Sequence, residues 1–315
     1  METGVQPMRK AEFQQVSKLM PGTAQLGISG YGIANRTQNV EADALLDRCG
    51  ELGINCFDTA LEYGDAELKL GRYFDGKPAP FLVSKVKADL ELDRAGLEKQ
   101  LTERVETILE RLRVRTLPAL MIHDPILLQV YGSMVTEILT KLRRDQLIGR
   151  AGVSFGANSD VQYAYCGHLL REDIYEVIQL PLHLWDRRAV ECGALSRFRA
   201  DGKWVVARSV FLQGLFFRQA DDLPEPLRSM ARGALGQLAE IAEEEGIAIA
   251  ELAMRYVRDT DGVNGIVVGA ERPEQLDDNV RLISGKPLSE KTRNKIESEF
   301  RGLPEMLITP ALWNK

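Results

Sequence analysis

The sequence predicts an α/β fold in which a single domain forms a closed (β/α)8 barrel, the TIM barrel. Three observations support this prediction. Short apolar segments alternate with longer amphipathic segments along the chain, as in repeated βα units around a parallel sheet. Eight such units can be counted, and no long linker separates them. The length of 315 residues fits a barrel of about 250 residues with additional segments.

The apolar segments give the expected strands, and the amphipathic segments give the expected helices. The strands are expected near residues 24 (the segment 22–26, GTAQL), 57, 83, 121, 152, 178, 206 and 267. The helices are expected at 41–52, 66–74, 95–112, 134–144, near 161, and at 190–199, 228–245, 248–258, 273–283 and 291–301. The helix near 161 has the weakest pattern, whereas Pro273 suits the first turn of a helix.

An open, doubly wound sheet is the alternative fold. Its mark would be GxGxxG directly after the first strand, where a helix begins. The residues after GTAQL are instead GISGYGIAN, whose glycines follow another order and open no helix. We therefore expect a barrel at 18–285, an N-terminal extension at 1–17, and a C-terminal helix and tail at 286–315 that pack on the barrel.

The composition excludes several classes of protein. Hydrophobic residues make up 44% of the chain, too many for a chain that is disordered throughout. The net charge is −6 without a basic cluster, so a nucleic-acid partner is not expected. No segment has the roughly 18 apolar residues that span a bilayer, and the first residues lack the apolar part of a secretory signal. We expect a cytoplasmic protein without a membrane partner.

The cysteines and histidines follow no metal-binding pattern. They are Cys49, Cys56, Cys166, Cys192, His123, His168 and His183. No CxxC, HExxH or HxH spacing occurs among them. We expect reduced thiols and no metal, with a disulfide or a metal site as the less favoured alternative.

Polar residues stand where several predicted strands end, and the active site of such a barrel lies at the carboxyl ends of its strands. The second strand ends in Asp58, with Tyr63 five residues later. Lys85 lies near the end of the third strand, and His123 ends the fourth. The following strands offer Ser154, Gln179, Arg208 and Ser209.

Four of these residue types suit proton delivery to an oxygen that becomes an alkoxide. A tyrosine has a pKa of about 10, and a nearby ammonium lowers it by stabilising the phenolate. Asp58 would keep Lys85 charged and oriented beside Tyr63, and His123 would position a carbonyl oxygen. This chemistry accompanies the arrival of a hydride at a carbonyl.

Each of the four also has an ordinary structural interpretation. Asp58 alone would be a surface or capping residue, Tyr63 a packed rim residue, and His123 a common residue at a strand end. Lys85 is the hardest to explain in this way, because an unpaired lysine in an apolar strand is costly to bury. Their joint occurrence at successive strand ends favours a site.

Several motifs resemble the aldo-keto reductase family. The segment GINCFDTALEYGDAELKLGRYF has a strand-end Asp, then Tyr-Gly, then Glu and Leu-Gly, as in that family. The similarity continues through VSKV, MIHDP, GRAGVS, VIQLPLHLWDRR, ARSVFLQGLF and VVGAERPEQLDDN and covers residues 22–283. It implies that Asp58, Tyr63, Lys85 and His123 form a catalytic tetrad, with Tyr63 as general acid and with Tyr63 and His123 against the substrate.

The resemblance also implies a nicotinamide cofactor, because family members use one. The residues that it assigns to the cofactor are Gly22, Thr23 and Asp58 near the ribose, Ser154 and Gln179 at the carboxamide, Arg208 at the nicotinamide, Ser209, Leu212, Gln213 and Gly214 along the pyrophosphate, and Gly269, Arg272, Gln275 and Asn279 at the adenosine end.

Three features depart from the pattern of many members. Phe155 replaces an Asn that holds the carboxamide, and Arg208 replaces an aromatic residue that stacks on the nicotinamide. A guanidinium plane can stack as well. Gly269 and Gln275 stand where a Lys and an Arg bind the 2′-phosphate, which leaves Arg272 as the replacement. NADP(H) is the expected cofactor, and NAD(H) is the alternative.

The expected reaction is hydride transfer between the nicotinamide and a small carbonyl or alcohol, such as an aldehyde, a ketone or a sugar. GTAQLG, YGIAN and ARSVFLQGL resemble a bacterial branch associated with sugar or polysaccharide metabolism. Trp185 would then line the substrate pocket, or alternatively pack near the barrel rim. The rival functions are a non-enzymatic sensor or regulatory subunit that binds the nucleotide, and a phosphate-binding barrel lyase or isomerase. No oligomeric state is predicted.

Overall fold

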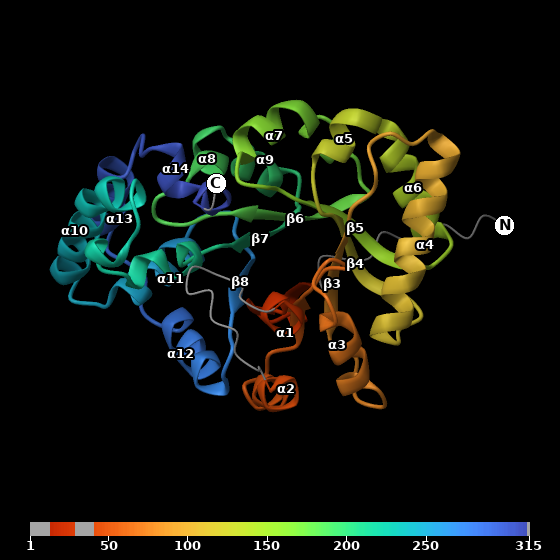
Figure 1. Cartoon of the computed structure of the whole chain (residues 1–315), viewed down its shortest axis with the longest axis horizontal. Coiled ribbons are helices and arrows are strands. Elements are labelled where there is room, and N and C mark those ends of the chain that lie inside the picture. The colour runs from red at the N-terminus through yellow and green to blue at the C-terminus, as the bar shows by residue number, and fades with distance from the viewer. Residues whose placement is uncertain (1–12, 29–40, 314–315) are drawn as a thin grey trace.

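A computed structural model describes residues 13–28 and 41–313 of the chain, and it confirms the predicted (β/α)8 barrel. Eight parallel strands close into a barrel in chain order, and helices surround them (Figure 1). The strands are β1 Leu19–Gly22, β2 Cys56–Asp58, β3 Phe81–Val86, β4 Leu117–Ile122, β5 Ile148–Ser154, β6 Tyr175–Pro181, β7 Trp204–Arg208 and β8 Gly265–Gly269. The barrel closes where β1 pairs with β8, from Leu19 opposite Ile266 to Gly22 opposite Gly269.

The helices fall close to the amphipathic segments. They are α1 Ala24–Gly27, α2 Ala42–Glu51, α3 Ala66–Phe74, α4 Arg94–Leu112, α5 Ile126–Tyr131, α6 Ser133–Arg144, α7 Ser159–Cys166, α8 Arg188–Glu191, α9 Ala194–Ala200, α10 Leu227–Glu245, α11 Ile249–Arg258, α12 Pro273–Ile283, α13 Glu290–Glu299 and α14 Glu305–Ile308. Short 3₁₀ helices include η1 Phe13–Gln15 and η3 Leu212–Phe217.

The first strand was placed too late in the chain by the sequence. The segment 22–26 was expected to be a strand, but β1 ends at Gly22 and α1 begins at Ala24. The strand is the preceding segment LMPG, which contains Pro21 opposite Val268. Proline lacks the amide hydrogen of a sheet ladder, so it argues against a strand in sequence analysis. The motif YGIAN lies outside the described residues.

The helix expected at 190–199 is two helices, α8 and α9. Gly193 lies between them with a φ of +79°, a left-handed conformation that breaks the helical path. Conversely, the weak segment near 161 does form a helix, α7.

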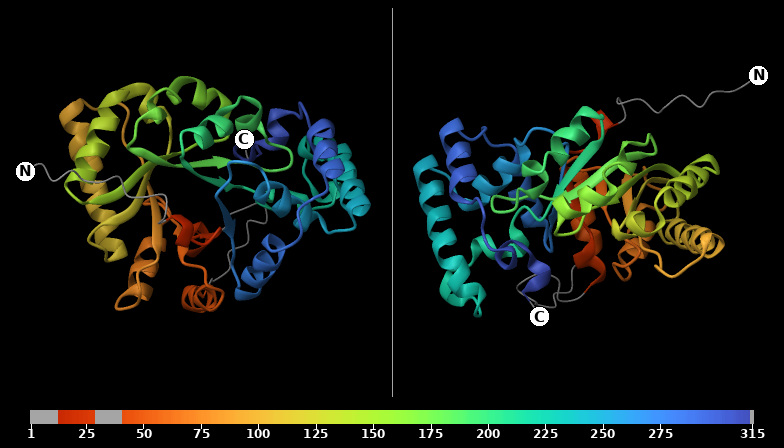
Figure 2. Two further views of the ribbon diagram at one scale, coloured as in Figure 1. Left: turned by 180° about the vertical axis from the view of Figure 1, so that it is seen from behind. Right: turned by 90° about the horizontal axis from the view of Figure 1, so that it is seen from above.

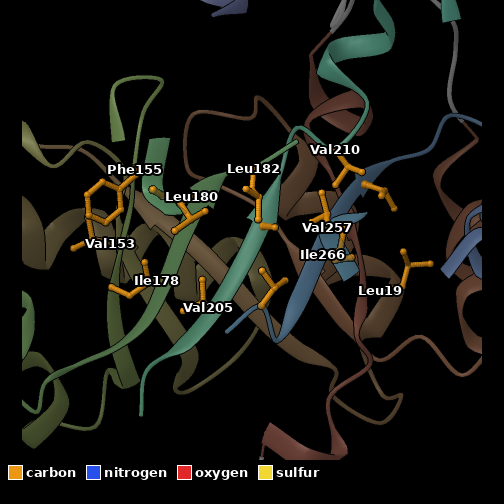
Figure 3. Close-up of a cluster of buried hydrophobic side chains, with 14 of the residues drawn as sticks. Leu19, Val153, Phe155, Ile178, Leu180, Leu182, Val205, Val210, Val257 and Ile266 are labelled. Carbon is orange, nitrogen blue, oxygen red and sulfur yellow. The ribbon is translucent and has the colours of Figure 1, made fainter. Parts of the chain in front are cut away.

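The core consists of two apolar clusters. The smaller one fills the barrel and includes Met20, Val83, Met121, Val177 and Val206. The larger one lies between the strands and the surrounding helices, and Figure 3 shows part of it, from Leu19 on β1 to Val153 on β5 and Val257 on α11. Alternate residues of each strand therefore face the barrel interior and the helices, which brings Lys85 into the interior near the end of β3.

An aromatic cluster lies at the amino ends of the strands. The ring of Phe13 stacks on Trp204 at a centroid distance of 4.8 Å, and the guanidinium of Arg150 lies 4.5 Å from the Phe13 ring. Trp204 is the first residue of β7. These contacts place Phe13 at the end of the barrel opposite the strand ends that carry Asp58 and Ser154.

The C-terminal segment packs on one side of the barrel, where α13 lies beside α10 (Figures 1 and 2). The buried side chain of Arg187 donates to the carbonyl oxygens of Ile296 and Glu297 in α13, at 3.0 and 2.9 Å. Lys295 pairs with Glu244 across the two helices at 2.6 Å. In the part of the chain that the structure describes, no helix has the length and apolar character needed to cross a membrane.

Candidate active site

A buried ion pair lies at the carboxyl ends of β2 and β3. The Nζ of Lys85 contacts both carboxylate oxygens of Asp58, at 2.7 and 2.8 Å, and donates to the carbonyl oxygen of Thr59 at 2.9 Å. Both residues are almost fully buried, with exposed fractions of 1% and 4%. Burial lowers the pKa of Lys85, and the charge of Asp58 opposes that shift. The predicted pairing of Lys85 with Asp58 is therefore present.

Two further side chains extend this pair into a buried polar network. The Nε2 of Gln179, on β6, donates to Asp58 Oδ1 at 2.7 Å. The hydroxyl of Ser154, at the end of β5, donates to Gln179 Oε1 at 3.1 Å. Thr23 lies on the other side, and its hydroxyl donates to the backbone carbonyl of Asp58 at 3.0 Å. Three residues expected at the cofactor therefore also hold Asp58 in place.

Tyr63 lies in the turn between β2 and α3, in front of the ion pair. Its ring centroid is 5.1 Å from Lys85 Nζ and 6.0 Å from the ring of His123, which meets it edge-on at 80°. The turn packs tightly on α1: a Cβ at Gly27 would lie 1.8 Å from the carbonyl oxygen of Tyr63, and one at Gly64 would lie 2.2 Å from that of Gly27. Gly64 also has a φ of +58°. The glycine after Tyr63 is required by this approach.

His123 follows β4, and its ring contacts a carboxylate that the sequence did not single out. The Nδ1 of His123 lies 2.9 Å from Oε2 of Glu62, the residue before Tyr63. Burial lowers the pKa of His123, although the hydrogen bond to Glu62 acts to raise it. Burial also acts to raise the pKa of Glu62, but the hydrogen bond and charge of His123 lower it overall. The structure thus adds Glu62 to the four residues expected.

A second carboxyl that had no assigned role lies behind the tetrad. Glu67, in the first turn of α3, is 1% exposed and accepts a hydrogen bond from the hydroxyl of Ser84 at 2.6 Å. Burial raises its pKa to about 7, against the hydrogen bond of Ser84 and the charge of Arg111. Glu67 is the Glu that follows Tyr-Gly in the segment that resembles the family, and this position was the sequence feature that could have pointed to it.

A cleft opens in front of these residues at the mouth of the barrel. It has a volume of about 280 Å³ and includes Asp58, Tyr63, Arg208, Gly22 and Gly269 in its lining. A second hollow of about 310 Å³, lined by Gln275 and Asn279 among others, shares three lining residues with the first: Phe211, Phe217 and Gly269. The two hollows together form an elongated groove from the tetrad to the start of α12.

The segment after β7 forms one wall of this groove. Ser209, Gln213 and Gly214 line it, and all three have left-handed φ values of 65°, 51° and 90°. The guanidinium of Arg208 donates to the carbonyl oxygen of Phe155 at 2.8 Å and to the Ser209 hydroxyl at 3.0 Å. Arg208 thus lies at the mouth with its orientation held by two contacts.

Some expected site residues lie elsewhere. Leu212 has no exposed side chain and belongs to the core. Trp185 is 3% exposed and packs edge-on against Phe216 at 4.9 Å, so it takes the packing role and is not among the residues that line the groove in the described structure. Arg272 is exposed at the start of α12 and is likewise outside that lining.

The adenosine end predicted by the sequence has defined polar groups. Gln275 Oε1 accepts from the backbone amides of Glu271 and Arg272, at 2.7 and 3.2 Å. The amide side chain of Asn279 is 6% exposed and lines the second hollow. Arg281, which the sequence did not single out, lines the same hollow and pairs with Asp278 at 3.1 Å.

The residues present fit a dinucleotide. The groove is long, its middle is bordered by the left-handed segment with Gly214, and amide and hydroxyl side chains supply donors along it. A Cβ at Gly269 would come 2.1 Å from Gln25 Nε2, and the wall of the groove at this position therefore consists of main-chain atoms. The first turn of α12, where a helix favours anions, borders the far hollow through Gln275.

Several known proteins are similar to this chain in sequence. A model of the aldo/keto reductase family matches residues 18–299. Curated relatives include an L-glyceraldehyde 3-phosphate reductase of Escherichia coli, 24% identical over 82% of this chain and 83% of that protein. They also include a D-threo-aldose 1-dehydrogenase of a Pseudomonas species, 25% identical over 84% and 92%.

Solved structures show the same fold. An aldo-keto reductase from Bacillus halodurans superposes with a TM-score of 0.67 at 23% identity, covering 90% of this chain and 91% of that one. The glycerol dehydrogenase of Gluconobacter oxydans gives a TM-score of 0.67 at 23% identity and covers 90% of each chain.

Proposed function

Because the chain belongs to the aldo/keto reductase family, an oxidoreductase family, we propose that it transfers a hydride between a nicotinamide and a small carbonyl or alcohol, with Tyr63 as general acid and base. The observation that carries the proposal is the ion pair of Lys85 and Asp58 behind Tyr63, at the end of the groove that Asp58 and Tyr63 line. When bound, the cofactor supplies or accepts the hydride.

The side chains of the site handle the proton. The phenol of Tyr63 donates its proton to the carbonyl oxygen during reduction, and the ammonium of Lys85 stabilises the resulting phenolate. Asp58 keeps Lys85 charged and in place, since three donors fix the carboxylate and its carbonyl: Lys85, Gln179 and Thr23. His123, whose ring lies 6.0 Å from that of Tyr63, would contact the same oxygen. In alcohol oxidation the same proton returns to Tyr63.

The groove and the polar network beside it would hold the proposed cofactor. Gly22 and Thr23 would hold the ribose, Ser154 and Gln179 the carboxamide, and the segment 209–214 the pyrophosphate. Gly269, Gln275 and Asn279, which line the second hollow, would hold the adenosine end. We propose that NADP(H) is preferred over NAD(H), because Arg272 and Arg281 are basic residues at or beside that end.

The names of the relatives suggest the class of substrate. One relative is a glyceraldehyde 3-phosphate reductase, one is an aldose dehydrogenase, and a structural neighbour is a glycerol dehydrogenase. We therefore propose small hydroxylated aldehydes, aldoses and their alcohols as substrates of this chain. A cytoplasmic location remains a prediction from the sequence.

The test is turnover of DL-glyceraldehyde, D-threo-configured aldoses and glycerol with NADPH or NADH and their oxidised forms, followed by absorbance of the reduced nicotinamide. Tyr63→Phe should lower kcat by ~10²–10⁴-fold, the usual contribution of a general acid, and leave the Kd of the nucleotide nearly unchanged. Full activity in this variant, or no nucleotide binding by the wild type, contradicts the proposal.

A further inference from the structure

The carboxylate of Glu62 contacts the imidazole ring of His123, one of the four residues expected to form the tetrad. Glu62 lies in the turn that carries Tyr63, and its Oε2 is 2.9 Å from Nδ1 of His123. The two side chains are 30% and 20% exposed, so both are mostly withdrawn from water. A carboxylate at this distance decides which nitrogen of the ring carries a proton.

The ionisation of Glu62 determines the direction of this hydrogen bond. Burial acts to raise the pKa of Glu62, but the hydrogen bond and charge of His123, and the charge of Lys87, lower it overall. The carboxylate is therefore ionised at neutral pH and only accepts. The shared proton resides on Nδ1 of His123. Because a neutral imidazole carries a single N–H, its Nε2 then carries no proton.

The charge state of His123 consequently decides what its Nε2 can bind. Burial lowers the pKa of the ring, and so do the charges of Lys85 and Lys87, while Glu62 opposes them. Above that pKa, Nε2 accepts a hydrogen bond, which suits the hydroxyl of an alcohol. Below it, Nε2 carries a second proton and donates, which suits the oxygen of a carbonyl.

We propose that Glu62 is a positioning residue that holds His123 as the Nδ1–H tautomer, so that the imidazolium binds a carbonyl and the neutral ring binds an alcohol. The kinetic consequence rests on the proposed function of this site. The tautomer itself is a property of the protein without nucleotide or substrate. A measurement on the protein alone therefore tests the first part independently of any turnover.

The histidine content of the chain makes that measurement direct. There are three histidines, so a long-range ¹H–¹⁵N spectrum contains three rings. His183 is an internal reference of the opposite kind: its Nδ1 accepts from the backbone amides of Trp185 and Asp186, at 3.3 and 3.2 Å, and burial lowers its pKa to about 4. His183 is therefore expected as the neutral Nε2–H form.

At pH 8, His123 should appear as the neutral Nδ1–H form. An Nε2–H form of His123 in the wild-type protein would overturn the proposal. Glu62→Gln keeps the shape of the side chain, but an amide both donates and accepts, so the tautomer is no longer held. In this variant the Nε2–H population of His123 should rise.

Asp65→Asn is the matched control, because Asp65 is three residues away from Glu62, is 53% exposed and pairs with Lys69. It removes the same charge from the same segment and should leave the tautomer as in the wild type.

The kinetic arm uses reduction of DL-glyceraldehyde with NADPH. In the wild type, kcat/KM should fall by about tenfold per pH unit above the pH at which the His123 ring titrates, since one proton is required. Glu62→Gln should flatten this limb, because neutral His123 can then donate from Nε2. Asp65→Asn should keep the wild-type limb. An unchanged profile and an unchanged tautomer in Glu62→Gln contradict the role of Glu62.

The two proposals fail in different ways. An Nδ1–H form of His123 without any turnover of aldehydes or alcohols supports the tautomer assignment and contradicts the proposed function. Turnover together with an Nε2–H form at pH 8 supports the proposed function and contradicts the role of Glu62.

Discussion

Glu67 is a buried carboxyl whose ionisation should cost stability, and Glu67→Gln tests this directly. Its Oε1 accepts from Ser84 at 2.6 Å, whereas its Oε2 lies 3.8 Å from Arg111 Nη1, beyond hydrogen-bond distance. Oε2 is among the buried atoms for which no hydrogen-bond partner is present. The negative charge of ionised Glu67 is therefore stabilised by only one hydrogen bond at Oε1 and none at Oε2 among the described residues. A glutamine keeps the acceptor for Ser84 and removes the charge.

The magnitude follows from the raised pKa of Glu67. The pKa is about 7 in the folded chain, against 4.5 for the free side chain. A difference of about 2.5 units at ~1.4 kcal/mol per unit gives about 3.5 kcal/mol, as an order of magnitude. The sign is fixed by linkage: between pH 4.5 and 7 the unfolded chain releases this proton while the folded chain keeps it. The free energy of unfolding is therefore highest below about pH 4.5, falls as the pH rises to about 7, and stays lower above pH 7.

The assay is urea unfolding of the wild type and of Glu67→Gln at pH values from 5 to 8. The variant should have nearly the wild-type midpoint at pH 5 and should be more stable by about 3 kcal/mol at pH 8. The control Glu106→Gln, on the exposed face of α4, should follow the wild type at every pH. Parallel curves for the wild type and Glu67→Gln would refute the reasoning, because they would mean that Glu67 is not protonated preferentially in the folded chain.

Three further predictions concern the groove and the ion pair. Lys85→Met removes all three contacts of the ammonium and leaves Asp58 buried, so it should cost ~3–5 kcal/mol in urea unfolding, and adding Asp58→Asn should recover part of that loss. Tyr63→Phe should have a free energy of unfolding within about 1 kcal/mol of the wild type although it loses turnover, and this result would separate a chemical role of Tyr63 from a structural one. Arg272→Ala should weaken NADPH binding by about tenfold to hundredfold and leave NADH unchanged; a wild type that prefers NADH, or an unchanged preference in the variant, contradicts the role of Arg272.

The fold could be predicted from the sequence because its main signal is periodic. A helix such as α4 keeps its apolar residues on one face, and Leu97, Leu101, Val105 and Ile108 are all fully buried. The errors arose where a single residue contradicts the usual pattern. The true first strand contains Pro21, a residue that strands usually lack, and Gly193 interrupts a helix whose apolar pattern continues beyond it. Such local interruptions depend on tertiary contacts, which the periodicity of the sequence does not encode.

The candidate site could be predicted only in part, for a related reason. Lys85 and Asp58 were recognisable because a charge inside an apolar strand requires a partner, and the strand order supplies one. Glu62 and Glu67 carry no such mark, since they stand in a polar segment of a chain with 46 acidic residues. Their importance comes from burial and from two neighbours distant in sequence, Ser84 on β3 and His123 after β4, which only the folded chain brings to them.

The polar network also explains why residues to which the sequence assigns separate roles should act together. Gln179 donates to Asp58 and accepts from Ser154, so the side chains proposed for the carboxamide already hold the ion pair. A ligand that drew the Gln179 amide away would remove one of the donors to Asp58 and leave Lys85 as its main partner. The ion pair would then be tighter, and Lys85 would be less available to a phenolate on Tyr63. We therefore expect Gln179 to keep its contact with Asp58 when a ligand binds, while its oxygen or the hydroxyl of Ser154 contacts the ligand. Substituting Gln179 should consequently impair nucleotide binding and the chemical step together, whereas substituting Asn279, which lines the second hollow, should impair binding alone.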